Sequence, residues 1–416
     1  MIKETSPCGE VPKPRGAGGR QEAQPYGDAL KFRGSEGSKS KGDGMNNSEE
    51  VKMGLTEEDI QHRDEGPGIA GLLAAMGDKD ADAAAIAKSE DGMLIARSMS
   101  VMQWPEDSPE SREYWAGFEK GLRKEVHGEG LDKWSSFIPS AAENDRERRF
   151  PLIFCLHGAH NPIQLTESYG IMQVAAREEC IVIAPENENW TSIERLLAYA
   201  KENYPVDESR IYSVGYSFGG FMSSRNVLAH PEIFAGVGMG GMLFAGNVPA
   251  HDLDGQWYEE YSLTEEMLQK AEKLGMPILL FMGENEMLRL LPLWKEPEGE
   301  IRDGVIPLFS EDKQKAFNNF RRAGQCGPTV FLKEGEASSE AEEHIGARFE
   351  RTEVREYHGR KYYIGDSVKD SGECLFRTVA CEKMVHWPTA AFADLVWEQI
   401  GRYRRDPQTG ELSHIK

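Results

Sequence analysis

Length, composition and charge already exclude several classes of protein. The chain has 416 residues, enough for two or three small domains or one large domain with additional segments. Its 70 acidic and 48 basic residues give a formal net charge of −22, which repels nucleic-acid phosphates and anionic membrane surfaces. We therefore expect neither a nucleic-acid partner nor a membrane partner.

The cysteines give no sign of a disulfide framework or of a metal site. Six cysteines are ordinary usage for a chain of this length, and no two of them form a C-x-x-C pair. Zinc ribbons, iron–sulfur clusters and thioredoxin-like sites therefore lack the ligand spacing that they require. We expect no metal and no organic cofactor.

Two segments bear on the location of the protein. The first 20 residues lack the apolar core of a secretory signal, so we expect a cytoplasmic protein with reduced thiols. Residues 233–251 carry no formal charge, but their five glycines and Pro249 predict a buried strand with its loop, not a membrane-spanning helix. The sequence leaves the oligomeric state open.

The N-terminal part is predicted to be a flexible, mostly disordered tail over residues 1–92. Its first fifty residues are rich in glycine and proline and poor in large apolar side chains, so burial cannot offset the entropy of ordering them. Short helices within 67–88 are the alternative for that stretch. A helical lead-in is expected over 93–130, because residues 108–126 form an amphipathic pattern that begins at the N-cap candidate Ser108.

From about residue 131 the sequence alternates between apolar runs and amphipathic segments. Continuous apolar runs are typical of strands covered on both faces, and their alternation with helices predicts a mostly parallel, doubly wound α/β sheet over 131–405, followed by a C-terminal tail over 406–416. The predicted strands are 134–140, 151–158, 180–187, 210–217, 234–241, 277–286 and 377–388, and the predicted helices are 190–204, 219–230 and 263–275.

Residues 291–375 interrupt this alternation. They contain the acidic run 334–344 and a predicted hairpin over 355–365. We expect an insertion here, either a cap over the carboxyl edge of the sheet or a solvated excursion without a catalytic part.

The most informative motif is Gly215-Tyr216-Ser217-Phe218-Gly219, which lies between a predicted strand and a predicted helix. This context predicts a nucleophile elbow, a strained turn that lifts a serine hydroxyl above the sheet. The two glycines let the strand and the helix pass closely. Ser217 is the predicted nucleophile, and the alternative is a loop serine that lies between glycines by chance.

A serine hydroxyl needs a general base, and along a chain with this elbow the order is serine, acid, histidine. His386 is the best candidate because it follows the last predicted strand, in a tight turn before the closing helix. A structural role is the alternative for this residue. The weaker candidates lie in a polar tail, a hairpin, an acidic run, a loop and the end of the elbow helix, and they are His414, His358, His344, His251 and His230.

The acid is expected in the loop after the strand that ends near Gly283. It must hold the imidazole in one tautomer and stabilise the imidazolium. Glu286 is the first choice and Glu284 the second, with a solvated loop charge as the alternative for either. Asp252 and Asp254, after the preceding strand, are outside alternatives.

The oxyanion that develops during ester cleavage needs two backbone donors. One is expected from the N–H of Phe218, directly after the nucleophile, and the other from Ala159, in the loop after the apolar run 151–158. His157 in the same loop is expected to be structural.

Three aromatic residues follow strand ends on the same predicted rim of the sheet. They are Trp190, Phe244 and Trp387. They are candidates for the lining of an acyl or aromatic pocket, and packing within the core or at the rim is the alternative for each.

Together these motifs resemble a known family. The run PLIFCLHG, the segments VDESRIYSVGYSFGG and HPEIFAG, and a histidine followed by Trp-Pro are similar to the polyhydroxybutyrate-depolymerase and feruloyl-esterase-like group of α/β-hydrolases. The resemblance covers about 131–405 and implies the α/β-hydrolase fold, with Ser217 as nucleophile and His386 as base. The acid of the family follows a Gly-x-x-Asp pattern, whereas Gly283-x-x-Glu286 stands here.

The leading functional hypothesis is a cofactor-free serine ester hydrolase that acts through an acyl-enzyme on a small or medium carboxylic ester, including aromatic acyl esters. A serine peptidase of the prolyl-oligopeptidase type is the second, although the N-terminal part is too short and too glycine-rich for the β-propeller that such enzymes usually carry. A non-catalytic binding protein with the same fold is the third, and the glutamate in place of aspartate is its only support.

Overall fold

The computed structural model describes residues 68–103, 121–145, 147–159, 161–243, 263–297, 308–389 and 391–415. Residues 1–50 and 51–416 separate into two units, so every described residue belongs to the second unit. Phe244, His251, Asp252 and Asp254 lie outside the described residues.

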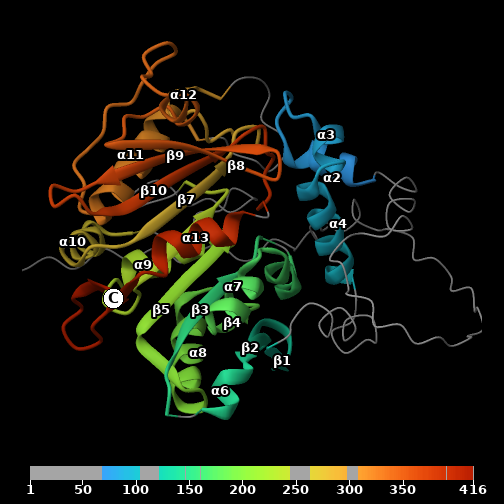
Figure 1. Cartoon of the computed structure of the whole chain (residues 1–416), viewed down its shortest axis with the longest axis vertical. Coiled ribbons are helices and arrows are strands. Elements are labelled where there is room, and N and C mark those ends of the chain that lie inside the picture. Colours follow the sequence, from blue (N-terminus) through green and yellow to red (C-terminus); the bar gives the residue numbers. More distant parts are fainter. Residues whose placement is uncertain are drawn as a thin grey trace, which may run out of the picture. The chain divides into compact units, whose positions relative to one another are not determined.

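Ten strands form one sheet, in the order β1-β2-β4-β3-β5-β6-β7-β10-β9-β8 (Figure 1). The six strands from β4 to β10 in this order run parallel, and the two strands at each edge pair antiparallel. The predicted parallel sheet is therefore confirmed. The strands are β1 (Leu122–His127), β2 (Trp134–Pro139), β3 (Phe150–Leu156), β4 (Ile181–Pro185), β5 (Val206–Tyr216), β6 (Gly236–Gly240), β7 (Ile278–Gly283), β8 (Arg351–Tyr357), β9 (Arg360–Val368) and β10 (Cys374–Cys381).

Both faces of the sheet are buried, because successive side chains of its strands enter two different cores. In β3, Leu152 and Phe154 enter the first core, whereas Ile153 and Cys155 enter the second. The first core is closed by α8 (Trp190–Asn203), α9 (Phe218–Ala229), α10 (Glu265–Leu274), α11 (Ser310–Ala323) and α12 (Glu340–Ile345), and the second by α7 (Ile171–Glu178) and α13 (Phe392–Ile400).

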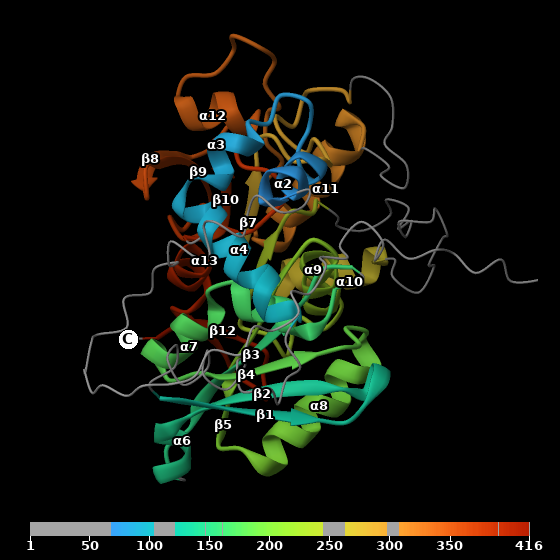
Figure 2. The same ribbon diagram turned by 90° about the vertical axis from the view of Figure 1, so that its right-hand side faces the viewer.

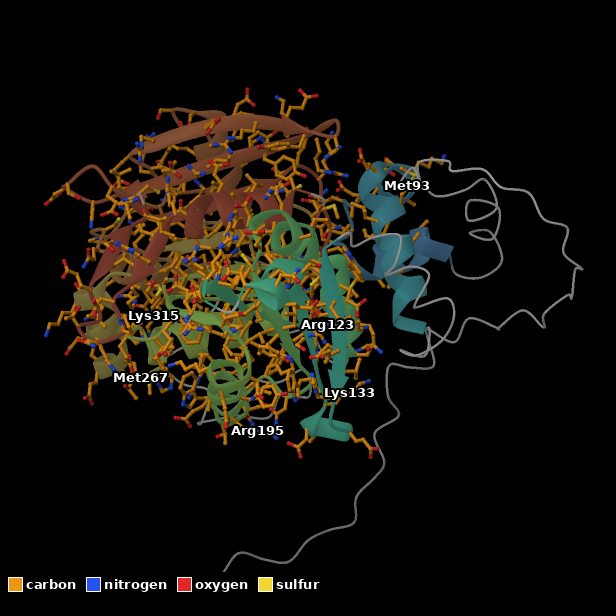
Figure 3. All side chains as sticks on the ribbon, turned by 60° about the horizontal axis from the view of Figure 1, so that its bottom comes forward. Met93, Arg123, Lys133, Arg195, Met267 and Lys315 are labelled. Carbon is orange, nitrogen blue, oxygen red and sulfur yellow. The ribbon has the colours of Figure 1, made fainter. Side chains whose placement is uncertain are left out.

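Helix α8 shows how the predicted amphipathic pattern is used. Ile193, Leu196 and Leu197 are buried in the first core, at the spacing of one helix face. Arg195 lies on the opposite, exposed face (Figure 3). Asn189 caps the helix, since its side chain accepts a hydrogen bond from the Ser192 N–H at 3.0 Å.

The sheet begins earlier than the expected boundary at residue 131, because β1 pairs antiparallel with β2 along its whole length. The helix expected over 108–126 is therefore wrong at its end, where residues 122–126 belong to this strand; residues 104–120 lie outside the described part. Helix-forming Lys and Glu dominate this segment, and cross-strand pairing overrides their propensity. Arg123 marks this edge in Figure 3.

The predicted flexible tail over residues 1–92 also extends too far along the chain. Within 68–92 the chain forms α2 (Gly68–Met76), α3 (Ala83–Ala87) and the start of α4 (Glu90–Gln103). Leu73 is fully buried and Ile86 is nearly so, both in the second core. Alanine and glycine dominate these helices, and only a few large apolar side chains attach them to the core. The composition of the segment therefore gives little indication that it is ordered.

The last part of the segment expected as an insertion belongs to the sheet. The predicted hairpin is confirmed as β8 and β9, whose turn contains His358 and Gly359, and β9 pairs antiparallel with β10. The hairpin therefore extends the sheet at its edge, whereas α11 and α12 of the same segment pack into the first core. Residues 298–307 lie outside the described part.

The C-terminal residues are also part of the fold. The strand β12 (Leu412–His414) pairs antiparallel with β11 (Tyr403–Arg405), so the expected tail over 406–416 is ordered at least to this strand. The fully buried Arg405 guanidinium donates to the carbonyls of Phe234 and Gly410, at 2.6 and 2.7 Å. Among the described residues, no helix has the length and apolarity to cross a membrane, and the glycine-rich run from 233 contains β6 as predicted.

Candidate active site

Ser217 lies in a strained turn between β5 and α9. Its backbone has φ 58° and ψ −125°, a conformation that costs a non-glycine residue on the order of 1–3 kcal/mol. A Cβ on Gly219 would overlap the carbonyl oxygens of Leu156 and His157, and one on Gly215 would overlap the carbonyl of Gly219. The two glycines of the motif are thus required by close backbone approach, as the sequence predicts.

Ser217, His386 and Glu286 form one hydrogen-bonded chain. The distance from Ser217 Oγ to His386 Nε2 is 2.8 Å, and that from His386 Nδ1 to Glu286 Oε2 is 2.9 Å. An ionised Glu286 can only accept, so Nδ1 carries the proton and donates it, and Nε2 accepts from the serine hydroxyl. Glu286 is fully buried, His386 is 4% exposed, and Ser217 is half-buried at the surface of the site.

The topology brings the acid and the histidine together. Glu286 follows β7 and His386 follows β10, and these strands are parallel neighbours whose carboxyl ends meet at one edge of the sheet. The Asn285 N–H donates to the Met384 carbonyl at 2.9 Å and joins the two loops directly. The Tyr216 ring packs edge-on against the imidazole at 5.4 Å between centroids.

Glu284, the second choice for the acid, has other partners. One of its carboxylate oxygens contacts His344 Nδ1, and the other accepts the Lys383 N–H at 2.8 Å. The His344 ring is stacked on Tyr363 at 3.6 Å. Glu284 and His344 therefore tie α12 to the loop after β7, away from Ser217.

The remaining described histidines also have partners elsewhere. His358 contacts Glu90 at 2.6 Å, and His414 contacts Glu373 at 2.8 Å. Of the histidines that the structure describes downstream of Ser217, His386 is the one hydrogen-bonded to the serine.

The loop after β3 lies directly beside the serine. A Cβ on Gly158 would stand 3.5 Å from the Ser217 Cβ, and Ala159 is the next residue. The Gly158 carbonyl, in the same peptide group as the Ala159 N–H, accepts from the Asn161 N–H at 3.2 Å. Phe218 is the first residue of α9, so its N–H belongs to the positive end of that helix.

Two of the three predicted pocket aromatics have packing partners in the structure. Trp190 begins α8, and its ring is stacked on His230 at 3.5 Å. Trp387 follows the histidine directly and is 6% exposed, within the second core. Packing, the alternative to a pocket role, therefore explains much of the burial of both tryptophan side chains.

Sequence reasoning missed a buried charge pair beneath the loop after β3. His157 Nδ1 lies 2.8 Å from the Gly158 carbonyl, and Nε2 lies 3.1 Å from the Glu186 carbonyl. Carbonyl oxygens only accept, so both ring nitrogens donate only when the ring is an imidazolium. Glu188, 4% exposed, places Oε1 3.9 Å from Nε2 and balances that charge.

Burial and the neighbouring groups shift both pKa values upward. Burial raises the pKa of the Glu188 carboxyl to about 7, against a smaller lowering by His157. Burial lowers the pKa of His157, but Glu188, the Gly158 carbonyl, and the carboxyl and carbonyl of Glu186 together raise it by more, so the net shift is upward. The pair joins the loops after β3 and β4. In the sequence, the position of Glu188 after a buried strand is the one indication of this contact.

This pair predicts a pH dependence of stability that Glu188→Gln removes. Because the folded state holds the Glu188 proton more tightly, wild-type unfolding free energy falls as pH rises from the ordinary pKa of 4.5 to about 7. The raised pKa of His157 acts in the same direction. We expect Glu188→Gln to lose this dependence, by up to about 3 kcal/mol for the carboxyl, in urea unfolding at pH 5 and pH 8. The exposed Glu202→Gln is the control, and an unchanged slope in Glu188→Gln would contradict the raised pKa of the Glu188 carboxyl.

No arrangement of metal ligands accompanies the site: in the described part of the chain, no group of three His, Cys, Asp or Glu residues is placed to hold an ion. The chemistry available there is that of a hydroxyl, an imidazole and a carboxylate in series, which is the arrangement of nucleophilic acyl transfer.

Comparisons with known proteins give weak sequence matches. No family model matches the sequence. A poly(3-hydroxyalkanoate) depolymerase from Paucimonas lemoignei is 26% identical over 108 residues, covering 21% of this chain and 26% of the relative. The chain thus matches about a quarter of the length of this curated relative.

Similar solved structures include an acetyl xylan esterase from Aspergillus awamori, 12% identical, which covers 67% of this chain and 99% of its own, with a TM-score of 0.41. An S-formylglutathione hydrolase from Staphylococcus aureus is 16% identical and covers 39% of this chain and 76% of its own, with a TM-score of 0.31. At TM-scores this low, the fold assignment rests on the strand order of the chain itself.

That order has a central parallel sheet with antiparallel β2 beside β4, a strained serine turn between β5 and α9, and an acid and a histidine after two later parallel strands. Helices cover both faces of the sheet. The chain therefore has the α/β-hydrolase fold.

Proposed function

We propose that the protein is a serine carboxylic-ester hydrolase. The observation that carries the proposal is the continuous hydrogen-bonded chain from Ser217 Oγ through His386 to the buried Glu286. A serine in a strained turn, a histidine that accepts its proton and a carboxylate that fixes the tautomer are the parts that acyl transfer requires.

In the first half of the reaction, Ser217 Oγ attacks the ester carbonyl carbon while its proton passes to His386 Nε2. Glu286 stabilises the imidazolium that forms, through the hydrogen bond from Nδ1. The N–H groups of Phe218 and Ala159 donate to the tetrahedral oxyanion. The intermediate collapses when His386 returns the proton to the leaving alkoxide, which departs as the alcohol and leaves an ester on Ser217.

In the second half, water takes the place of the alcohol. His386 accepts a proton from water, whose oxygen attacks the acyl carbon of the ester on Ser217. The second tetrahedral intermediate releases the carboxylic acid, and the proton on Nε2 returns to Ser217 Oγ. Apart from the attacking water, both halves use only side chains and backbone groups of this chain.

The proposed substrate is a small or medium carboxylic ester. The half-buried serine is reached from the carboxyl edge of the sheet, where ligands of parallel sheets bind. An acyl group with an aromatic ring is the extension of the proposal, because Trp190 and Trp387 stand near strand ends at that edge. We propose no nucleic-acid or membrane partner, on the grounds of the net charge of −22.

Hydrolysis of p-nitrophenyl acetate and butyrate tests the proposal. We expect turnover by the wild type and a loss of about 10⁴-fold or more in kcat for Ser217→Ala. Ser140→Ala is the control and should retain activity. It removes a hydroxyl that donates to the Gly121 carbonyl and has no part in the hydrogen-bonded chain of Ser217. Absence of turnover by folded wild type toward these esters and toward an amide panel would overturn the proposal.

A further inference from the structure

A short segment that precedes the sheet crosses the two loops that carry the acid and the histidine. This segment, Met76–Asp78, is called the strap below. The Met76 carbonyl accepts from the Met287 N–H at 3.1 Å and from the His386 N–H at 2.9 Å. The Asp78 N–H donates to the Asn285 carbonyl at 2.9 Å.

The strap therefore contacts the backbone next to both Glu286 and His386. Gly77 and Glu286 form an antiparallel β-bridge, so the backbone on both sides of the acid is bonded to the strap. One carbonyl, that of Met76, holds both the loop of the acid and the residue that supplies the base. The distance between Glu286 and His386 is thus set partly by a segment more than two hundred residues earlier in the chain.

The strap is itself anchored. Leu73 and Ile86, on the helices before and after it, are buried in the second core together with Val385. The nearly buried Asp91 accepts from Arg360 Nε at 2.7 Å, and Arg360 also donates to the Glu382 carbonyl at 2.7 Å. Figure 2 shows α2 and α3 beside the ends of β7 and β10, where these contacts are made.

Gly77 is the position where the fit is tightest. A Cβ there would stand 2.6 Å from the Ala81 Cβ and 2.9 Å from Val385 Cγ1, one residue before His386. Any side chain at residue 77 must therefore push the strap away from the histidine loop or shift that loop.

We propose that the strap is a positioning element of the active site, which holds Glu286 and His386 at hydrogen-bonding distance and makes the N-terminal part of the chain necessary for full activity. The inference rests on the proposed ester hydrolysis. Displacements of about 1 Å at catalytic groups lower rates by as much as 10²-fold, so a small shift of the strap has a measurable effect.

Gly77→Ala in the full chain tests the proposal, with Gly327→Ala as the matched control, because a Cβ on Gly327 meets no atom within 4 Å. We expect kcat for p-nitrophenyl butyrate to fall at least about tenfold in Gly77→Ala while KM changes less than about twofold. The rate of labelling of Ser217 by a fluorophosphonate should fall in parallel. The double variant Gly77→Ala with Ala81→Gly removes the nearer clash and should recover part of kcat.

Several outcomes would overturn the proposal. Wild-type kcat in a folded Gly77→Ala variant would show that the strap does not position the site, as would an equal loss in the control. If Gly77→Ala does not fold, Asp91→Asn carries the test, and full activity there with normal thermal unfolding contradicts the role. Failure of the wild type itself to hydrolyse esters or to react with the fluorophosphonate would instead refute the proposed function.

Discussion

Replacing His386 with alanine is expected to lower kcat/KM for p-nitrophenyl butyrate by about 10⁴-fold or more. Nε2 lies 2.8 Å from Ser217 Oγ, and no second histidine bonds to this serine among the described residues. Without the imidazole, water is left to accept the proton of the serine hydroxyl. A hydroxyl without a positioned base is a poor nucleophile. Steady-state hydrolysis measured with thermal unfolding separates this loss from misfolding.

The control for this variant is His414→Ala. His414 contacts Glu373 on the surface, so its loss should change kcat/KM by less than about twofold. Equal activity in His386→Ala and the wild type would remove the general base from the account. A double variant of Ser217 and His386 should lose no more activity than either single variant, since the two residues act as one unit.

Replacing Glu286 with glutamine is expected to have the second-largest effect, a loss of about 10³- to 10⁴-fold in kcat. Glutamine keeps the size of the side chain, but its NH₂ group can favour the wrong tautomer of His386 and carries no charge to stabilise the imidazolium. The substitution also leaves a neutral amide in a fully buried site. The same hydrolysis assay, compared at several pH values, measures the effect.

Glu284→Gln is the matched control, because the two glutamates are separated by one residue and only Glu286 contacts His386 in the structure. We expect Glu284→Gln to change kcat by only a few fold, through the weakened contact with His344. A large loss in Glu284→Gln with little loss in Glu286→Gln would reverse the assignment of the acid.

Much of the fold could be predicted because the central strands read as continuous apolar runs. The predicted segments 151–158, 180–187 and 234–241 each match a strand of the parallel sheet to within a few residues. The structure brings Ser217, His386 and Glu286 together because strand ends of a parallel sheet share one edge, so the position of each residue after a predicted strand made it a candidate.

The features that the sequence did not predict depend on contacts between residues far apart in the chain. The strand β1 has the composition of a helix, and pairing with β2 decides its structure. The strap contributes backbone groups, and neither a carbonyl nor an N–H leaves a pattern in side chains. The contacts of His157 with two carbonyls and with Glu188 join separate loops, which no local pattern of residues reports.

The most direct test is to trap the covalent intermediate. Wild type and Ser217→Ala would be mixed with p-nitrophenyl acetate, quenched in acid within the first turnover and measured by intact-mass and peptide mass spectrometry. We predict one acetyl group on the wild type, located on Ser217, and none on the variant, with a burst of p-nitrophenol only in the wild type. Turnover with the acetyl group on another residue, or an equal burst from Ser217→Ala, would contradict the assignment of Ser217 as the nucleophile.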